Sequence, residues 1–81
     1  MRKVKLWGSL STVCGGNEEL TTEARNIREL FQELKERFPG ISTYLDLGIA
    51  VAIDGTIYRD NWSKKLPEDA EIFLLPRLAG G

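Results

Sequence analysis

The chain contains no histidine and only one cysteine among its 81 residues. Without histidine it lacks the commonest general base, and neither a Ser/His catalytic site nor a Cys/His metal site can be assembled. Cys14 cannot form a disulfide within the chain, and no basic or histidine residue stands beside it in the sequence to activate its thiol. These absences predict a protein with neither a metal site nor a catalytic thiol.

Long apolar runs and an excess of one charge are also missing. Eleven basic and twelve acidic side chains give a net charge of −1, so there is no excess positive field for nucleic acid. No apolar run approaches the roughly 20 residues that span a bilayer, and residues 3–7 alternate in polarity where a signal peptide would be continuously apolar. We therefore expect one cytoplasmic domain that binds neither nucleic acid nor membrane.

A phosphate-binding loop and a convincing pair of catalytic carboxylates are absent as well. Gly15-Gly16 is not followed by the Lys-Ser/Thr of a phosphate-binding loop. The remaining candidate carboxylates all stand in predicted turns, where acidic residues are ordinary: Asp54, Asp60, Glu68 and Asp69. We expect a chain that is not an enzyme and binds no cofactor of its own.

The first third of the chain predicts two strands. Val4 and Leu6 alternate with polar neighbours, which is typical of a strand with one buried face. Residues 8–16, rich in Ser, Thr and Gly, predict a loop. Residues 17–22 then predict a second strand that pairs back on the first as a hairpin.

A helix follows, because Asn26 is a good N-cap and Glu29 stands at capping-box spacing from it. Pro39-Gly40 should stop this helix, and residues 41–48 form a connection of undefined structure. The apolar face of the helix should bury these residues: Ile27, Leu30, Phe31, Leu34 and Phe38.

The last part of the chain predicts three more strands. Residues 49–53 and 56–58 flank Asp54-Gly55, a strong hairpin signal. A turn at 66–70 precedes the last strand, residues 72–75, and Pro76 can end the pairing because it has no N–H. The predicted fold is α+β, a mixed sheet of about five strands with one main helix packed on one face. The predicted core comprises Leu30, Leu34, Val51, Ile53, Ile72 and Leu74.

The chain ends in two glycines, Gly80 and Gly81. By chance this would occur in roughly 0.5% of chains. Glycine has no Cβ, so such an end can thread a narrow channel and expose its carboxylate to another protein's catalytic groups. A carboxylate is a poor electrophile until it is activated, most simply as a mixed anhydride with a nucleotide. We predict a domain at residues 1–76 and a flexible tail at 77–81.

The chain resembles the ubiquitin-like sulfur-carrier family in the order of its parts. These parts are the hairpin, the capped helix, the 53–55 turn, the 66–71 segment and the ending 75–81. That family includes the molybdopterin synthase small subunit and the thiamine-biosynthesis sulfur carrier. The resemblance spans essentially the whole chain and implies a β-grasp fold. The 7–10 segment is similar to molybdopterin-type members, whereas Arg77 stands where those commonly have a second proline.

The resemblance also implies a mechanism and partners. A ubiquitin-activating-type adenylyltransferase uses ATP to adenylate Gly81, and a sulfur donor converts the adenylate to a thiocarboxylate. The sulfur passes to an acceptor enzyme, which is a molybdopterin synthase large subunit or a thiazole synthase. The residues that thread the partner's active site are Pro76, Arg77, Leu78, Ala79 and Gly80.

Other functions use the same tail. The sulfur could go to thiazole, transfer RNA or cysteine instead of molybdopterin. The chain could also be a ubiquitin-like modifier, in which the activated carboxyl of Gly81 ends on a lysine amine. Besides a sulfur carrier and a modifier, the chain could be a passive binding domain, whose function survives trimming of the glycines.

Strand alternation predicts a docking surface on the sheet face away from the helix. If Ile72 and Leu74 point inward, Phe73 and Leu75 point outward, and the same rule places Trp7 on the outer face. In the family fold the first and last strands are neighbours, which would gather Trp7, Phe73 and Leu75 at the base of the tail. An apolar patch of this kind usually marks a partner site.

Overall fold

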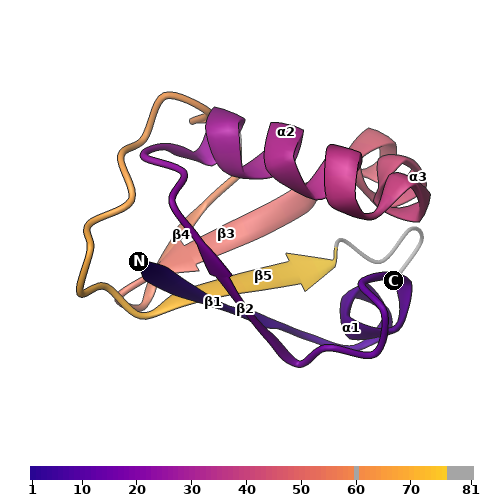
Figure 1. The fold of residues 1–81 in the computed structure, drawn as a ribbon. Helices are drawn as coiled ribbons and strands as arrows, with labels where there is room; N and C mark the ends of the chain where they lie inside the picture. Colours follow the sequence, from indigo (N-terminus) through magenta and orange to yellow (C-terminus); the bar gives the residue numbers. More distant parts are fainter. Residues whose placement is uncertain (60, 77–81) are drawn as a thin grey trace.

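A computed structural model describes residues 1–59 and 61–76 of the chain. Five strands form one mixed sheet in the order β2-β1-β5-β3-β4. The longest helix, α2, lies across one face of this sheet, and no helix of the described residues crosses the other face (Figure 1). The predicted architecture, with about five strands and one main helix on one face, is confirmed.

The first two strands form the predicted antiparallel hairpin. β1 (Arg2–Leu6) pairs with β2 (Glu19–Thr22), which begins two residues later than predicted, and Val4 stands opposite Leu20. Val4, Leu6 and Leu20 are buried, whereas Lys3, Lys5 and Glu19 beside them are exposed. This alternation leaves one face of the hairpin for the core.

The predicted loop at residues 8–16 is wrong, because it contains the short helix α1 (Ser9–Val13). Its local composition favours a loop, but Leu10 and Cys14 are one helical turn apart and both are fully buried. Gly8, at a φ of 56°, turns the chain sharply after β1. Burial of two apolar side chains in the core therefore outweighs a weak local propensity.

Helix α2 (Ile27–Arg37) begins where its cap predicts. The side chain of Asn26 accepts a hydrogen bond from the Glu29 N–H at 2.8 Å, and the Glu29 carboxylate accepts one from the Arg25 N–H at 2.8 Å. The predicted apolar face is buried apart from its last member: Phe38 caps the C-terminus of α2 and is only half-buried. A helix that ends one residue before Phe38 leaves that ring outside the buried stripe.

The undefined connection at residues 41–48 is helical. A 3-10 turn, η1 (Pro39–Ile41), leads into α3 (Ser42–Leu47), and Ile41 is fully buried. Pro39 does stop α2, but its fixed φ suits the first turn of a new helix. Gly48, at a φ of 106°, ends α3 and directs the chain into the next strand.

The last three strands complete the sheet. β3 (Ile49–Ile53) and β4 (Thr56–Tyr58) form the predicted hairpin, with Asp54 at a φ of 49° in its turn. β5 (Ile72–Pro76) lies in the centre of the sheet, parallel to β1 and antiparallel to β3. All six predicted core residues are buried: Leu30, Leu34, Val51, Ile53, Ile72 and Leu74.

Candidate functional site

The site begins where β5 ends. The pairing of β5 extends one residue further than predicted, because Pro76 stands opposite Ile49 as the last residue of the strand. A strand end is where a residue without an N–H is tolerated. Pro76 thus lies in the sheet. The other predicted tail residues lie outside the described part of the chain: Arg77, Leu78, Ala79, Gly80 and Gly81.

Phe73 and Leu75 lie on the outer face of the sheet, as alternation with the buried Ile72 and Leu74 predicts. Both are half-buried. Phe73 stands between Lys5 of β1 and Ala52 of β3, and the Lys5 Nζ lies 5.4 Å from the centre of its ring. That distance is within the range of a cation–π contact, which holds the ammonium over the ring.

Trp7 lies beside the end of β5. It follows β1 directly, and its backbone N–H donates to the carbonyl of Leu74 at 3.2 Å. The residue is 59% exposed. Leu75 stands opposite Ala50 of β3, whose small side chain leaves the outer face of β5 uncovered at this point. The structure therefore brings Trp7 and Leu75 to the same end of the sheet, with Phe73 one step further along β5.

Sequence reasoning missed one member of this surface, Ile57. It pairs with Ala52 across the β3–β4 hairpin and is 52% exposed. Paired residues of neighbouring strands share a face, so Ile57 extends the apolar row from Phe73 through Ala52 to the sheet edge. The Asp54-Gly55 turn fixes the pairing of β3 with β4. This turn was therefore the sequence signal from which the outward position of Ile57 could have been predicted. We call the set Trp7, Ile57, Phe73 and Leu75 the outer apolar surface.

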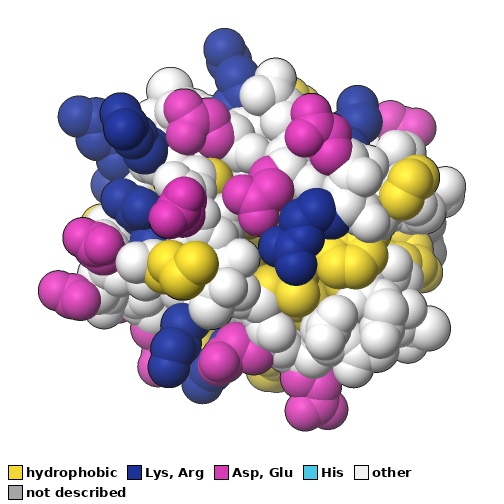
Figure 2. Space-filling view, in the orientation of Figure 1, with side chains coloured by type: hydrophobic (Ala, Val, Ile, Leu, Met, Phe, Trp, Pro, Cys, Tyr) yellow, Lys and Arg dark blue, Asp and Glu magenta, His cyan; other side chains and the backbone are white. Residues whose placement is uncertain are grey.

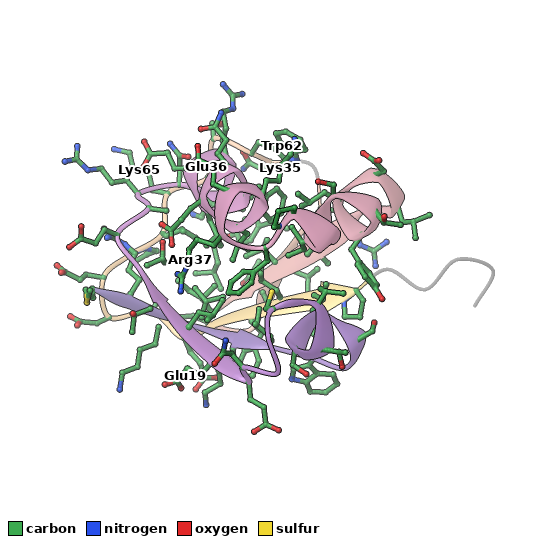
Figure 3. The ribbon with its side chains drawn as sticks, turned by 45° about the vertical axis from the view of Figure 1, so that its right-hand side comes forward. Glu19, Lys35, Glu36, Arg37, Trp62 and Lys65 are labelled. Atoms are coloured by element: carbon green, nitrogen blue, oxygen red, sulfur yellow. The ribbon has the colours of Figure 1, made fainter. Side chains whose placement is uncertain are left out.

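The surface over α2 and the β2 edge of the sheet differs in character. Charged side chains of both signs are spread over the side that carries α2 and β2, with apolar atoms in separate areas between them (Figure 2). Trp62, 46% exposed, lies beside α2 and packs edge-on against Phe31 with ring centres 5.7 Å apart (Figure 3). That contact gives Trp62 a packing role on the helix side.

The N-terminus of α2 is not available for an anion. Its first N–H groups already donate to the chain: Ile27 to the carbonyl of Lys64 at 3.1 Å and Arg28 to the carbonyl of Trp62 at 2.9 Å. The Glu29 N–H donates to Asn26. Helix N-termini bind phosphate through such groups only when they are free. These three N–H groups at the N-terminus of α2 are therefore not free to bind a phosphate.

Groups that could perform chemistry are committed elsewhere or separated. Cys14 is fully buried, and burial raises the pKa of its thiol although the nearby Arg37 charge lowers it. Asp54 accepts from the Glu71 N–H at 3.0 Å, and Glu68 lies 3.2 Å from the N-terminal amine. Asp60 lies outside the described residues. Over residues 1–59 and 61–76, no group of three or more His, Cys, Asp or Glu side chains could hold a metal ion.

Within the same described ranges, no helix has the length and apolar character that crossing a membrane requires. The longest of these helices, α2, has 11 residues.

Comparisons with known proteins agree with this architecture. Residues 4–81 match the model of the ThiS family. No curated protein is significantly similar in sequence. Among solved structures, the chain aligns over 100% of both chains, with a TM-score of 0.77 and 19% identity, to a chain of the BexX/CysO complex of Amycolatopsis orientalis.

Two archaeal proteins have similar structures. A putative molybdopterin converting factor, subunit 1, from Pyrococcus furiosus has a TM-score of 0.71 and 21% identity over 94% of this chain and 95% of that one. Small archaeal modifier protein 1 from Methanosarcina acetivorans has a TM-score of 0.70 and 23% identity over 98% of this chain and 94% of that one. These likenesses confirm the predicted β-grasp, ubiquitin-like fold.

Proposed function

This chain belongs to the ThiS family, and on that basis we propose that it is a sulfur carrier that bears its sulfur on the carboxyl group of Gly81. The observation that carries the proposal is the extent of the family match, which runs through the whole domain and on to Gly81. The position of β5 supports it, since this strand leads from the centre of the sheet towards the segment that contains Gly81.

The proposed chemistry takes place on a partner. An oxygen of the Gly81 carboxylate attacks the α-phosphorus of ATP, pyrophosphate leaves, and an acyl-adenylate forms. A hydrosulfide equivalent from a sulfur donor then adds to the acyl carbon, AMP leaves, and a thiocarboxylate remains. The partner is an adenylyltransferase of the ubiquitin-activating type, which binds the ATP. The first N–H groups of α2 already donate hydrogen bonds within the chain, which is in keeping with ATP binding to the partner.

We assign recognition of the partner to the outer apolar surface. Trp7 and Leu75 lie at the end of the sheet from which residues 77–81 continue, and Phe73 and Ile57 extend the surface across β5 and β4. Large aromatic side chains dominate the energetics of protein interfaces. A partner seated on this surface would hold the domain while Pro76, Arg77, Leu78, Ala79 and Gly80 lead to its active site.

For the sulfur acceptor we propose the large subunit of a molybdopterin synthase. The similarity of the 7–10 segment to molybdopterin-type members supports this choice, as does the fold shared with the Pyrococcus furiosus protein. The alternative acceptors are thiazole synthase, the enzymes of transfer RNA thiolation and the enzymes of cysteine synthesis. Co-purification with the native large partner decides among them.

A second candidate function is protein modification. Arg77 favours it, because ubiquitin-type tails carry arginine near this place, and the fold is shared with small archaeal modifier protein 1. In this alternative the activated Gly81 carboxyl forms an amide with a lysine Nζ of a target protein. The activation step is the same as for a carrier, and only the fate of the acyl group differs.

Intact-mass spectrometry tests the proposal. The protein is incubated with ATP, Mg²⁺, a sulfide source and the ubiquitin-activating-type enzyme of its own organism. We expect the mass to rise by the difference between one sulfur and one oxygen. Lysine adducts of other proteins that retain the tail would instead establish a modifier. An unchanged mass with no adducts, together with full function after removal of both glycines, would establish a passive domain.

A further inference from the structure

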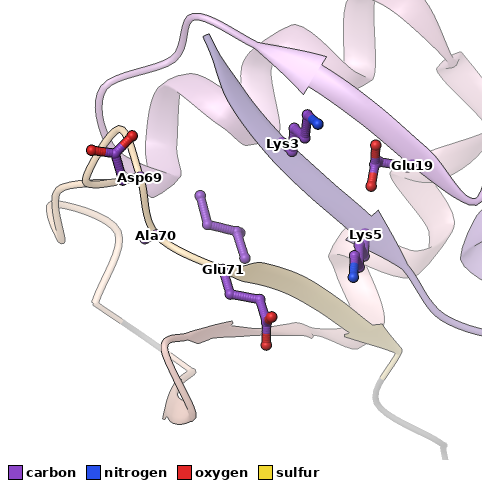
Figure 4. Close-up of a pocket in the computed structure, with 7 residues that line it drawn as sticks. Lys3, Lys5, Glu19, Asp69, Ala70 and Glu71 are labelled. Carbon is purple, nitrogen blue, oxygen red and sulfur yellow. The ribbon is translucent and has the colours of Figure 1, made fainter.

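The end of the sheet where β5 stops is flanked by two short helices. β1 and β5 lie side by side and run in the same direction (Figure 4, where Lys3 and Lys5 mark β1 and Glu71 precedes β5). β5 ends at the side of the molecule that carries α1 and α3 (Figure 1). Both neighbours of β5 are joined to one of these helices by a short link, because α1 follows β1 and α3 precedes β3. The helices therefore determine which backbone groups a longer β5 could bond to.

On the β1 side, the ladder stops at Trp7. The Trp7 N–H donates to the Leu74 carbonyl at 3.2 Å. In a parallel ladder the next hydrogen bond would run from the N–H of residue 76 back to the Trp7 carbonyl. Pro76 has no N–H, and the Trp7 carbonyl accepts from the Leu10 N–H at 3.1 Å, where α1 begins. The sequence thus omits the donor of this bond and engages its acceptor elsewhere.

On the β3 side, the ladder stops at Gly48. The Asp54 N–H donates to the Glu71 carbonyl at 2.9 Å, and hydrogen-bonded pairs recur at every second residue of an antiparallel ladder. Pro76 therefore faces β3 in a pair without hydrogen bonds, and the Gly48 N–H is the next donor that β3 could offer. That N–H donates instead to the Tyr44 carbonyl at 2.9 Å and caps α3. Both neighbouring strands thus end at the level of Pro76.

We propose that Pro76 is a positioning residue for the activation of Gly81. Together with the engaged groups of Trp7 and Gly48 it ends the sheet at a fixed point, so that the terminal carboxylate is always five residues away from the sheet. Five fully extended residues span at most about 17 Å. The importance of this distance for activation rests on the proposed function.

The point at which the sheet ends matters because adenylation requires the carboxylate oxygen to lie close to the phosphorus that it attacks. A misplacement of about 1 Å, caused by a change far from the reaction, can cost about a hundredfold in rate. One further residue in the strand would shorten the reach beyond the sheet by about 3.4 Å. Proline also fixes its φ at about −65°, which limits the directions in which the chain can leave the sheet. Pro76 would thus act on the reaction through the position of the Gly81 carboxylate.

The first test uses the free chain and does not depend on the proposed function. Pro76→Ala restores an N–H directed towards the Trp7 carbonyl, which has a second lone pair to accept it. In the ¹⁵N-labelled variant, the amide at position 76 should exchange with D2O at least about tenfold more slowly than an unstructured amide. The urea midpoint should not fall, because the new hydrogen bond offsets the greater freedom of the unfolded chain. Exchange at the unstructured rate would overturn the proposal.

The second test measures ATP–pyrophosphate exchange with the purified activating enzyme. Pro76→Ala should lower kcat at least about fivefold and change KM for the chain by less than about twofold, because the outer apolar surface can still dock. The control is Pro67→Ala, the same substitution in the exposed turn before β5, which should leave both constants within about twofold of the wild type. An unchanged kcat, a rise in KM alone, or an equal effect of Pro67→Ala would overturn the proposal.

The stability of the variant separates positioning from a merely structural role. A urea midpoint that fell together with kcat would mean that Pro76 only stabilises the end of β5, and the proposal would be wrong. Failure of the wild-type chain to be activated would instead reject the proposed function, and with it the role in activation. The amide exchange of the free variant would still decide whether Pro76 ends the pairing of β5, since that measurement needs no partner.

Discussion

On the inner face of the sheet, the side chains of β3 and β5 that point towards α2 are almost completely buried, whereas on the outer face their immediate neighbours in sequence remain partly exposed. Leu74 is 0% exposed, and Phe73 beside it lies under the Lys5 ammonium on the other side of the same strand. One strand therefore has a fully buried face and a partly exposed face. The inner residues supply stability, and we assign recognition to the outer ones.

This separation makes the two roles independently testable. Residues on one strand that point to opposite faces share a backbone but few contacts, so substitutions on one face should leave the role of the other face intact. The predictions below probe that independence, beginning with the change that should have the largest effect.

Deletion of Gly81 should abolish ATP-dependent activation altogether, because the terminal carboxylate then belongs to Gly80 and falls one residue short of the partner's adenylation site. The free energy of unfolding should stay within about 0.5 kcal/mol of the wild-type value, since the buried core residues lie between Val4 and Leu74, away from the deleted residue. Pyrophosphate exchange measures the first quantity and urea denaturation the second. Addition of one residue after Gly81 should have the same effect, and undiminished exchange in either variant would show that Gly81 is not the attachment site.

Leu74→Ala should lower the free energy of unfolding by about 2–5 kcal/mol, because it leaves a cavity beneath α2 at the centre of the sheet. That is a large share of a small domain's stability. The matched control is Lys35→Ala on the exposed side of α2, which should change stability by less than about 0.5 kcal/mol. A urea midpoint equal to that of the wild type would mean that the inner face contributes little.

Phe73→Asp should weaken binding to the activating enzyme or the acceptor by more than about tenfold, or about 1.4 kcal/mol, with little loss of stability. An aspartate on the outer face loses the aromatic contact and adds a charge to the apolar row. Trp62→Asp makes the same kind of change on the helix side and should not alter either affinity. If isothermal titration shows Phe73→Asp binding both partners normally, the tail alone provides recognition.

Asn26→Ala should cost about 1 kcal/mol of stability, because the Glu29 N–H loses its partner at the start of α2. The effect should appear in thermal unfolding and be absent from partner binding, since Asn26 is on the helix side of the sheet. Asn26→Asp keeps an acceptor at the cap and should retain most of the stability. Equal losses in both variants would point to a role of Asn26 other than capping.

Much of the inner face could be predicted from the sequence, because its signals are local. Asn26 and Glu29 mark the start of α2, and Asp54-Gly55 marks the β3–β4 hairpin, where neighbouring residues determine the backbone. The helix at Ser9–Val13 could not be predicted in the same way. Its residues have weak helix propensity, and α1 is stabilised by burial of Leu10 and Cys14 against distant segments.

The outer face was predicted only in part. Alternation placed Phe73 and Leu75 correctly, but the contribution of Ile57 depends on β3 lying between β4 and β5. Propensity and periodicity do not specify which strands are neighbours across a sheet, and the resemblance to a family supplied the contact between the first and last strands.

The central position of β5 has a consequence for how the protein is made. β1 pairs with β2 and β3 pairs with β4, so the first four strands to leave the ribosome form two hairpins that only β5 can join. Joining them requires contacts between β1 and β5 that are distant in sequence, which form late and slowly. A nascent chain that stops before β5 therefore lacks a closed core and the Phe73 and Leu75 side chains of the outer apolar surface. Such an incomplete chain would leave the edges of β1 and β3 that pair with β5 without partners, and unpaired strand edges favour aggregation.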